Sequence, residues 1–301
     1  MGSIGPVTEL LPPPRPPLGL RPDAVLDGGL STQLERRGAR VDGPLWTARL
    51  LLDDPGLVAA AHRDFVDAGA DVVITASYQV SRRGFVEQGL STDDADAALR
   101  RSVATARESG AIVAASVGPY GATLHDGSEY RGRYGLAHRD LVDFHRERLD
   151  VLVAAGPDLL AVETIPDVDE IAALAEVLAD HPGLPAWLSM TLADDRHLAD
   201  GRELREAVAV AGGVVSALGI NCTAPHLVSP ALEHLRTLTD LPFVVYPNAG
   251  GTWDAQAKEW TGSVAATFDE AAHWRELGAV LVGGCCGVDA DAIRTLASSA
   301  A

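Results

Sequence analysis

The sequence predicts an α/β protein built as a single (β/α)8 TIM barrel. From residue 24 onward, eight short apolar or β-branched runs alternate with longer amphipathic stretches, which is the order that this barrel requires. An open doubly wound sheet alternates in the same way, but no glycine fingerprint of the dinucleotide-binding type follows the first run. Neither an internal repeat nor a linker divides the chain, so we expect one domain.

The predicted strands are short and poor in charge, and several follow a helix-ending glycine. Gly69, Gly156 and Gly278 each stand just before such a run, where a left-handed glycine can end a helix and turn the chain into a strand. In chain order, the predicted strands cover residues 24–27, 71–77, 112–118, 158–163, 186–192, 214–221, 242–246 and 279–283.

The predicted helices are the stretches between these runs, which are rich in Ala, Leu, Glu and Arg. Their apolar residues recur at helical spacing, so that one face of each helix can cover the sheet. In chain order, they cover residues 56–68, 93–109, 138–155, 169–179, 204–211, 230–238, 265–277 and 289–297.

The first 22 residues differ from the rest because proline clusters dominate them. We expect residues 1–22 to form a flexible arm and residues 23–301 to form the barrel domain. The arm lacks the basic and apolar regions of a secretory signal, and no apolar run approaches the roughly 20 residues of a membrane span. Three cysteines make no disulfide framework, so the sequence indicates a cytoplasmic protein.

The charge balance limits the partners. Lys and Arg total 24 against 42 Asp and Glu, which gives a formal net charge of −18. Such a surface repels phosphate backbones, and the sequence has no basic stripe. We therefore expect small-molecule substrates, with neither nucleic acid nor a membrane as a partner.

Chemically capable residues or tight glycine turns close each predicted strand. Because all strand ends of a barrel converge on one mouth, these residues are expected to lie near one another. Polar residues can also mark strand ends generally, but the opposite ends carry fewer of them. The ends read Asp27-Gly28-Gly29, Ser77-Tyr78, Gly118-Pro119, Glu163-Thr164, Thr191, Asn221-Cys222, Tyr246-Pro247-Asn248 and Gly284-Cys285-Cys286.

The three cysteines predict a zinc site at that mouth. Cys222 ends the sixth strand, and Cys285 and Cys286 follow the eighth. A lone cysteine is usually a small core residue, but three at one rim suit a tetrahedral zinc with an open position, as in catalytic sites. His226 is an alternative fourth ligand that would close the site.

Zinc held by three thiolates favours one kind of chemistry. It is a weak Lewis acid for hydrolysis, but it can bind a further sulfur and lower that thiol's pKa. Water activation usually employs His and carboxylate ligands, and the nine histidines show no paired ligand spacing. The cysteines therefore indicate attack by a thiolate on a carbon atom.

These residues lie in motifs that resemble the homocysteine S-methyltransferase family, from residue 25 to about residue 297. The segments at residues 116–121 and 126–132 look most like the branch that uses S-methylmethionine; betaine–homocysteine methyltransferase is another relative. The matching motifs are Leu26-Asp27-Gly28-Gly29-Leu30, Pro44-Leu45-Trp46, Thr75-Ala76-Ser77-Tyr78-Gln79, Glu163-Thr164-Ile165-Pro166, Gly219-Ile220-Asn221-Cys222-Thr223, Tyr246-Pro247-Asn248-Ala249-Gly250 and Gly283-Gly284-Cys285-Cys286.

The resemblance implies roles for residues around the zinc. Cys222, Cys285 and Cys286 would be its ligands, with the homocysteine sulfur as the fourth. Glu163 and Asp27 would bind the substrate ammonium, as a buried carboxylate needs a cation; for Glu163, a helix cap or an internal ion pair is the alternative.

Further residues are expected to complete the substrate site. Gly28 would offer its backbone N–H to the substrate carboxylate or serve the turn alone, and Asn221 would brace Cys222. Trp46, Tyr78 and Tyr120 are candidates to line the donor side, since aromatic faces attract sulfonium cations. The resemblance also implies that Tyr78 can take the fourth zinc position before substrate arrives.

The sequence therefore predicts a zinc-dependent enzyme that transfers methyl from a sulfonium donor to the thiolate of L-homocysteine, forming methionine. S-methylmethionine is the expected donor, with S-adenosylmethionine as another sulfonium candidate. Two alternatives stay open: a betaine-dependent enzyme with the same acceptor, and a non-catalytic zinc-binding barrel.

Overall fold

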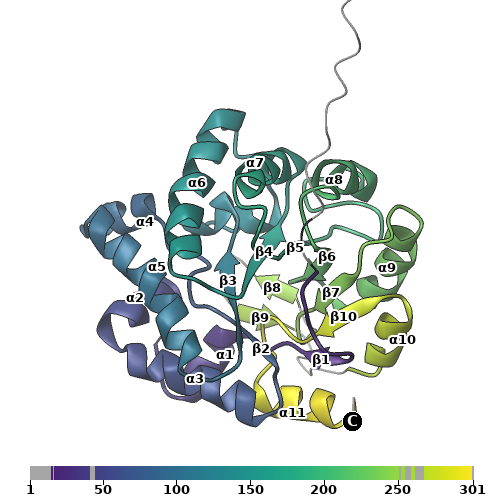
Figure 1. The fold of residues 1–301 in the computed structure, drawn as a ribbon, viewed down its shortest axis with the longest axis horizontal. Helices are drawn as coiled ribbons and strands as arrows, with labels where there is room; N and C mark the ends of the chain where they lie inside the picture. Colours follow the sequence, from purple (N-terminus) through teal and green to yellow (C-terminus); the bar gives the residue numbers. More distant parts are fainter. Residues whose placement is uncertain are drawn as a thin grey trace, which may run out of the picture.

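The chain folds into a (β/α)8 barrel, as predicted (Figure 1). This computed structural model describes residues 15, 17–40, 45–250, 252–254, 259–261 and 268–299. Its main sheet has eight parallel strands in the order β1-β10-β7-β6-β5-β4-β3-β2. The strands are β1 (Ala24–Val25), β2 (Val72–Ile74), β3 (Ile112–Val117), β4 (Leu159–Ile165), β5 (Ala186–Met190), β6 (Ala217–Asn221), β7 (Phe243–Tyr246) and β10 (Ala279–Val282).

Backbone hydrogen bonds close the barrel between its first two strands. Leu26, just beyond β1, forms a parallel bridge with Val72 of β2. The Asp27 N–H donates to the Val72 carbonyl at 3.0 Å, and the Asp71 N–H donates to the Val25 carbonyl at 2.8 Å. The seam therefore fixes the backbone of Asp27, the first predicted site residue.

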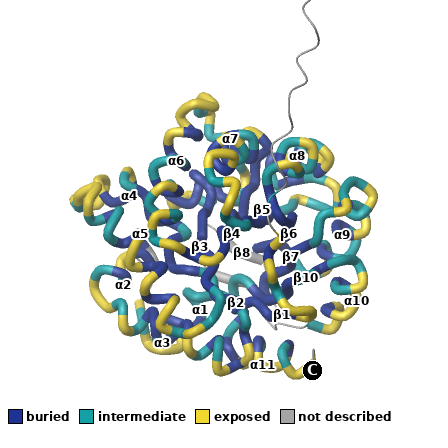
Figure 2. The backbone as a smooth tube through the Cα atoms, in the orientation of Figure 1, coloured by how far each residue is buried: buried dark blue, intermediate teal, exposed yellow. Residues whose placement is uncertain are grey.

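Helices surround the strands, with buried residues facing inward and exposed residues outward (Figures 1 and 2). Each predicted helix has a counterpart, and Gly69, Gly156 and Gly278 have the expected positive φ angles of 106°, 73° and 105°. The counterparts are α3 (Pro55–Asp67), α5 (Thr92–Arg107), α6 (His138–Ala154), α7 (Val168–Ala179), α8 (Leu204–Ala211), α9 (Val228–Arg236), α10 (Ala271–Glu276) and α11 (Ala290–Ser299).

The core has two layers because successive side chains of a strand point to opposite faces. In β7, Val244 packs inside the barrel, whereas Phe243 and Val245 pack against the helices. Inside the barrel, the indole of Trp187 donates to the Tyr246 hydroxyl at 3.0 Å. The lower barrel is thus filled with side chains, and the open space lies at the C-terminal strand ends.

Several short elements were not predicted. They are α1 (Leu30–Arg36), α2 (Trp46–Asp53), α4 (Arg82–Glu87), the 3-10 turns η1 (Tyr120–Thr123), η2 (Ser128–Tyr130) and η3 (Pro225–Leu227), and a hairpin of β8 (Thr252–Asp254) and β9 (Glu259–Thr261).

Two predicted segments lie partly outside the described residues. The helix predicted at 265–277 is observed from Ala271, and its residues 265–267 lie outside the described part. Most of the predicted arm lies outside it as well, so its flexibility stays a prediction. Leu18, near the end of that arm, is buried in the inner cluster of the barrel.

Among the described residues, no helix is long and apolar enough to cross a membrane.

Candidate active site

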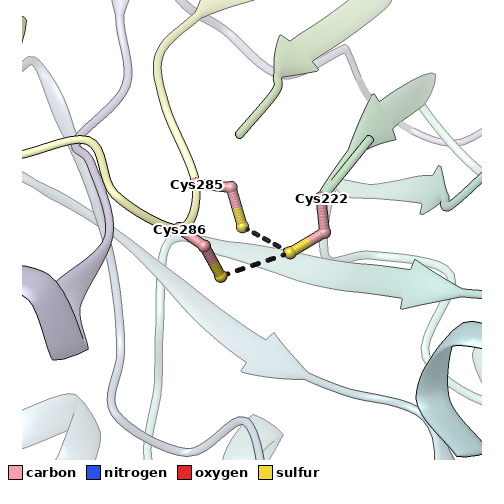
Figure 3. A group of neighbouring side chains, drawn as sticks. All are labelled: Cys222, Cys285 and Cys286. Atoms are coloured by element: carbon pink, nitrogen blue, oxygen red, sulfur yellow. Dashed lines mark hydrogen bonds between the residues drawn. The ribbon is translucent and has the colours of Figure 1, made fainter. Parts of the chain in front are cut away.

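The three cysteine side chains meet at the barrel mouth (Figure 3). The Cys222 Sγ lies 2.9 Å from the Cys285 Sγ and 3.6 Å from the Cys286 Sγ. All three sulfurs lie within 4.8 Å of one another, and none forms a disulfide. Side chains 63 and 64 positions apart in the sequence are therefore brought into contact.

This sulfur cluster fits a metal with thiolate ligands. A tetrahedral zinc with Zn–S bonds of about 2.3 Å needs sulfurs about 3.8 Å apart; the observed 3.6 Å spacing is close to that value, and the 2.9 Å spacing would have to widen. Hydrogen bonds from Cys222 and Cys285 hold the pKa of Cys286 well below its usual range. Hydrogen bonding to Cys222 instead raises the pKa of Cys285. The neighbouring thiols therefore stabilise a thiolate at Cys286. Three thiolates at this distance would repel one another, so all three cysteines can ionise together only around a cation.

The backbone at Cys222 is held in an unusual conformation. Cys222 has φ of 47° and Thr164, at the end of β4, has φ of 59°; non-glycine residues adopt such angles only where surrounding structure enforces them. Asn221 supplies that structure: its Oδ1 accepts from the Thr164 N–H and its Nδ2 donates to the Thr164 Oγ1, both at 2.8 Å. Asn221 therefore joins two strained strand ends, which agrees with the bracing role expected for it.

Close backbone packing explains the glycines before Cys285 and Cys286. A Cβ atom on Gly283 would lie 2.6 Å from the Asp27 carbonyl oxygen, and one on Gly284 would lie 2.2 Å from Val288. The Cys285 N–H donates to the Pro247 carbonyl at 2.8 Å. Only glycine lets this segment pass so near the barrel seam while presenting both sulfurs to Cys222.

A pocket opens beside the sulfurs. Tyr130 is its nearest hydroxyl to the cluster, 3.6 Å from the Cys222 Sγ; burial raises the pKa of this phenol. Tyr78 also lines the pocket, but its hydroxyl bonds Thr164. The pocket is lined by Gly28, Gly29, Leu30, Ser31, Thr32, Thr47, Ile74, Thr75, Ala76, Tyr78, Gln79, Glu129, Tyr130, Glu163, Thr164, Cys222, Tyr246, Gly284, Cys285 and Cys286.

Two buried carboxylates lie at the predicted ammonium site. Glu163 lines the pocket and accepts hydrogen bonds from Ser116 and Tyr246, and burial raises its pKa to about 7. Asp27 is 1% exposed and accepts from the Ile74 N–H at 2.8 Å, but its Oδ1 has no hydrogen-bond partner. Burial, and secondarily the Glu163 charge, raises the pKa of Asp27. Neither forms an ion pair within the described part of the chain, and Asp167 rather than Glu163 caps α7, so the helix-cap and ion-pair alternatives for Glu163 find no support.

The other predicted residues divide between the pocket and its surroundings. Gly28 lines the pocket, but the Gly29 N–H donates to the Val288 carbonyl at 2.8 Å, which favours a conformational role for that turn. The side chain of Trp46 lies outside the described residues. Tyr120 does not line the pocket, because its ring packs against Tyr134 and Phe144.

The alternative fourth ligand is not near the sulfurs. His226 is exposed in η3 and does not belong to the group of potential metal ligands formed by the described residues. The proposed closed site with this histidine therefore lacks support in the geometry.

Sequence reasoning missed Glu129 and Tyr130, which the turn η2 brings into the pocket. Both belong to the loop that follows β3, and loops after barrel strands build the mouth of this fold. Their position in that loop was the available signal.

The comparisons with known proteins agree with this geometry. The sequence pattern of the family described as homocysteine S-methyltransferase matches residues 24–300. Homocysteine S-methyltransferase 4 of Zea mays is 42% identical, with 91% of this chain and 88% of the relative covered. Homocysteine S-methyltransferase of Escherichia coli K12 is 45% identical, with 87% and 90% covered.

Solved structures give the same result. The metallated form of the homocysteine methyltransferase MmuM from Escherichia coli matches with a TM-score of 0.84 and 42% identity, covering 94% of this chain and 98% of that one. The chain belongs to the homocysteine S-methyltransferase family of enzymes.

Proposed function

We propose that this protein holds zinc with Cys222, Cys285 and Cys286 and methylates the thiol of L-homocysteine to give methionine. The observation that carries the proposal is the cluster of three sulfurs within 4.8 Å at a pocket. No fourth His, Cys, Asp or Glu ligand joins this group within the described part of the chain, which supports a position open to substrate. Metallation of the Escherichia coli relative supports a metal here.

Cys222, Cys285 and Cys286 would hold the zinc, which when bound would lower the pKa of a coordinated thiol and so keep it nucleophilic near neutral pH. The protein's own part is to bind and orient the rest of the homocysteine molecule. Glu163 and Asp27 pair with the substrate ammonium, which brings one positive charge to two carboxyl groups that otherwise lie buried without a cation; burial raises both of their pKa values, which favours one of them staying protonated.

The methyl transfer needs no general base among the side chains. The thiolate lone pair forms the new S–C bond while the C–S bond of the donor sulfonium breaks, and its electron pair stays on the donor sulfur as a neutral thioether. The pocket contributes by holding both reactants in line, which accounts for much of the rate in such reactions. Tyr78 and Tyr130 border this space and offer aromatic faces to the sulfonium.

The donor we propose is S-methylmethionine, with S-adenosylmethionine as a second sulfonium donor. Betaine is the competing donor, because it also loses a positive charge when its methyl group leaves.

Three free cysteines in the chain support a reducing compartment such as the cytoplasm.

A donor comparison tests this function. Zinc-loaded protein and homocysteine are incubated with S-methylmethionine, S-adenosylmethionine or betaine, and methionine is measured. We expect the fastest formation with S-methylmethionine and none with zinc-free Cys286→Ala protein. Activity only with betaine would replace the donor, and a zinc-free Cys286→Ala protein that kept activity would contradict the proposal.

A further inference from the structure

Glu129 is a buried carboxylate that the roles assigned above leave without a function. It lies in η2, after β3, and its side chain lines the same pocket as the cysteines. Glu129 is only 7% exposed, and its Oε2 has no hydrogen-bond partner. Burying a charged oxygen without a partner is costly, so the pocket is built to receive a group that compensates it.

Among the residues that the structure describes, none forms an ion pair with Glu129. The neighbouring Arg131 lies 3.5 Å from the Asp126 carboxylate and 3.3 Å from the Ser128 Oγ. Burial raises the pKa of Glu129 to about 7. The carboxylate therefore gains most from a ligand that brings a positive charge into the pocket.

The position of Glu129 favours the methyl donor over the acceptor. Glu163 and Asp27 belong to the ends of β4 and β1 and account for the acceptor ammonium under the proposed function. Glu129 comes from a separate loop, directly before Tyr130, whose hydroxyl lies 3.6 Å from the Cys222 Sγ. Glu129, Tyr130 and Tyr78 all line the pocket, so Glu129 shares this space with the two aromatic residues that border the donor under the proposed function.

A sulfonium amino acid carries two positive charges, and they differ during the reaction. The sulfonium charge disappears as the methyl group leaves, so a carboxylate paired with it would stabilise the ground state more than the transition state. The ammonium charge is unchanged throughout. A carboxylate that binds the ammonium gains affinity without slowing the transfer.

We propose that Glu129 binds the α-ammonium of the methyl donor and so selects amino-acid donors over betaine, whose only cationic group is the trimethylammonium that gives up the methyl and has no N–H. This inference rests on the proposed function, since it assigns the donor half of that site. It makes Glu129 a residue that determines donor specificity.

The test compares the wild type with Glu129→Gln, which keeps the shape and removes the charge. Calorimetry with zinc-loaded protein, without homocysteine, measures binding of S-methylmethionine and of dimethylsulfoniopropionate, a sulfonium that lacks the ammonium. We expect Glu129→Gln to weaken S-methylmethionine binding about tenfold or more. The affinity for dimethylsulfoniopropionate should be the same in the wild type and in Glu129→Gln, or too weak to measure in both.

Kinetics and a matched variant complete the design. Asp143→Asn removes one charge at a side chain of α6 that is 62% exposed, and it should leave donor binding unchanged. With Glu129→Gln, the KM for S-methylmethionine should rise about tenfold while the KM for homocysteine and the zinc content stay the same.

Three results would overturn the inference: unchanged S-methylmethionine binding, an equal loss for both sulfonium compounds, or a rise in the homocysteine KM alone. Binding is measured without turnover, so the two proposals can fail separately. A protein that binds S-methylmethionine through Glu129 but transfers no methyl group would refute the proposed function only.

Discussion

Glu163 shows how a single buried residue can serve binding at the expense of stability. Its pKa is raised to about 7, mainly by burial, from an ordinary value of 4.5. In the folded protein without ligand, the Glu163 carboxyl stays neutral up to about pH 7. Its contribution to the free energy of unfolding is therefore fully present below pH 4.5 and is lost as the pH rises through about 7. A substrate ammonium would reverse this loss by pairing with the carboxylate.

Replacing this charge should therefore stabilise the empty protein. We expect Glu163→Gln to raise the free energy of unfolding at pH 8 by about 3 kcal/mol and to have little effect at pH 4.5. Denaturant unfolding of the metal-free protein at both pH values measures this difference. The same variant should lose most of its affinity for homocysteine.

An exposed carboxylate provides the comparison. Asp143 on α6 is 62% exposed, so Asp143→Asn should change stability little at either pH. If Glu163→Gln were destabilising at pH 8, Glu163 would have a cationic partner inside the protein, and its assignment to the substrate ammonium would fail.

At the residue scale, the sequence could identify the groups that stand directly at strand ends. Cys222 and Cys285 follow their strands closely and Glu163 lies near the end of β4, so the barrel alone places them. Glu129 and Tyr130 could not be placed in this way, because a turn distant from any strand holds them. Contacts between distant parts of the chain fix that turn: the Arg133 N–H donates to Asp167, and Gly132 packs against the same side chain.

At the scale of elements, α6 positions the loops that carry the pocket. Arg148 of α6 is 1% exposed and donates to the carbonyls of Gly118 at 3.0 Å, Tyr78 at 2.8 Å and Ser77 at 3.4 Å. Burial lowers its pKa to about 10. Its planar group of five donors joins the segments after β2 and β3, and a Cβ on Gly118 would lie 2.6 Å from the Tyr78 ring.

A lysine cannot reproduce this arrangement. Arg148→Lys keeps the charge but leaves some carbonyls unpaired, which should cost about 2 kcal/mol of stability. Because Tyr78 would shift, we also expect kcat/KM to fall at least tenfold with zinc content unchanged. Denaturant unfolding, steady-state kinetics and metal analysis measure the three quantities.

A core variant separates positioning from general loss of stability. Ile171→Val, on α7, removes one buried methyl group and should cost about 1 kcal/mol without altering kcat/KM. If Arg148→Lys lowered stability while its kinetic constants matched those of the wild type, Arg148 would be structural alone.

The long elements followed from the sequence, whereas the short ones did not. Sixteen residues of α5 or seventeen of α6 give a clear helical period, but the six of α4 span fewer than two turns. The strands were predicted longer than observed in several cases, as with residues 71–77 against Val72–Ile74 of β2. A strand ends where its hydrogen bonds to a neighbouring strand end, and the residues of one segment do not show where that neighbour ends.

At the scale of the whole molecule, closure of the barrel creates the site. Strand β7 lies between β6 and β10 in the sheet, and the segment after it binds both cysteine segments. The Pro247 carbonyl accepts from the Cys285 N–H at 2.8 Å, and the Asn248 N–H donates to the Thr223 carbonyl at 3.1 Å. The distance between Cys222 and Cys285 is therefore set by the barrel.

Strand alternation and strand-end chemistry were enough to predict this architecture and the convergence of the thiols. The shape of the pocket was not predictable, because it depends on how η2 and the segment after β2 pack over the mouth. Those contacts involve Arg148, which stands in the sequence as an ordinary helix residue, and Asp167, which stands there as an ordinary helix cap.

The central claim is that three cysteines hold one zinc with a position open to the substrate thiol. X-ray absorption at the zinc edge, with and without homocysteine, tests it most directly. We expect three sulfur neighbours at about 2.3 Å in the protein alone and four when homocysteine is added. A zinc that already has four protein ligands, or a sulfur count that homocysteine leaves unchanged, would contradict the account.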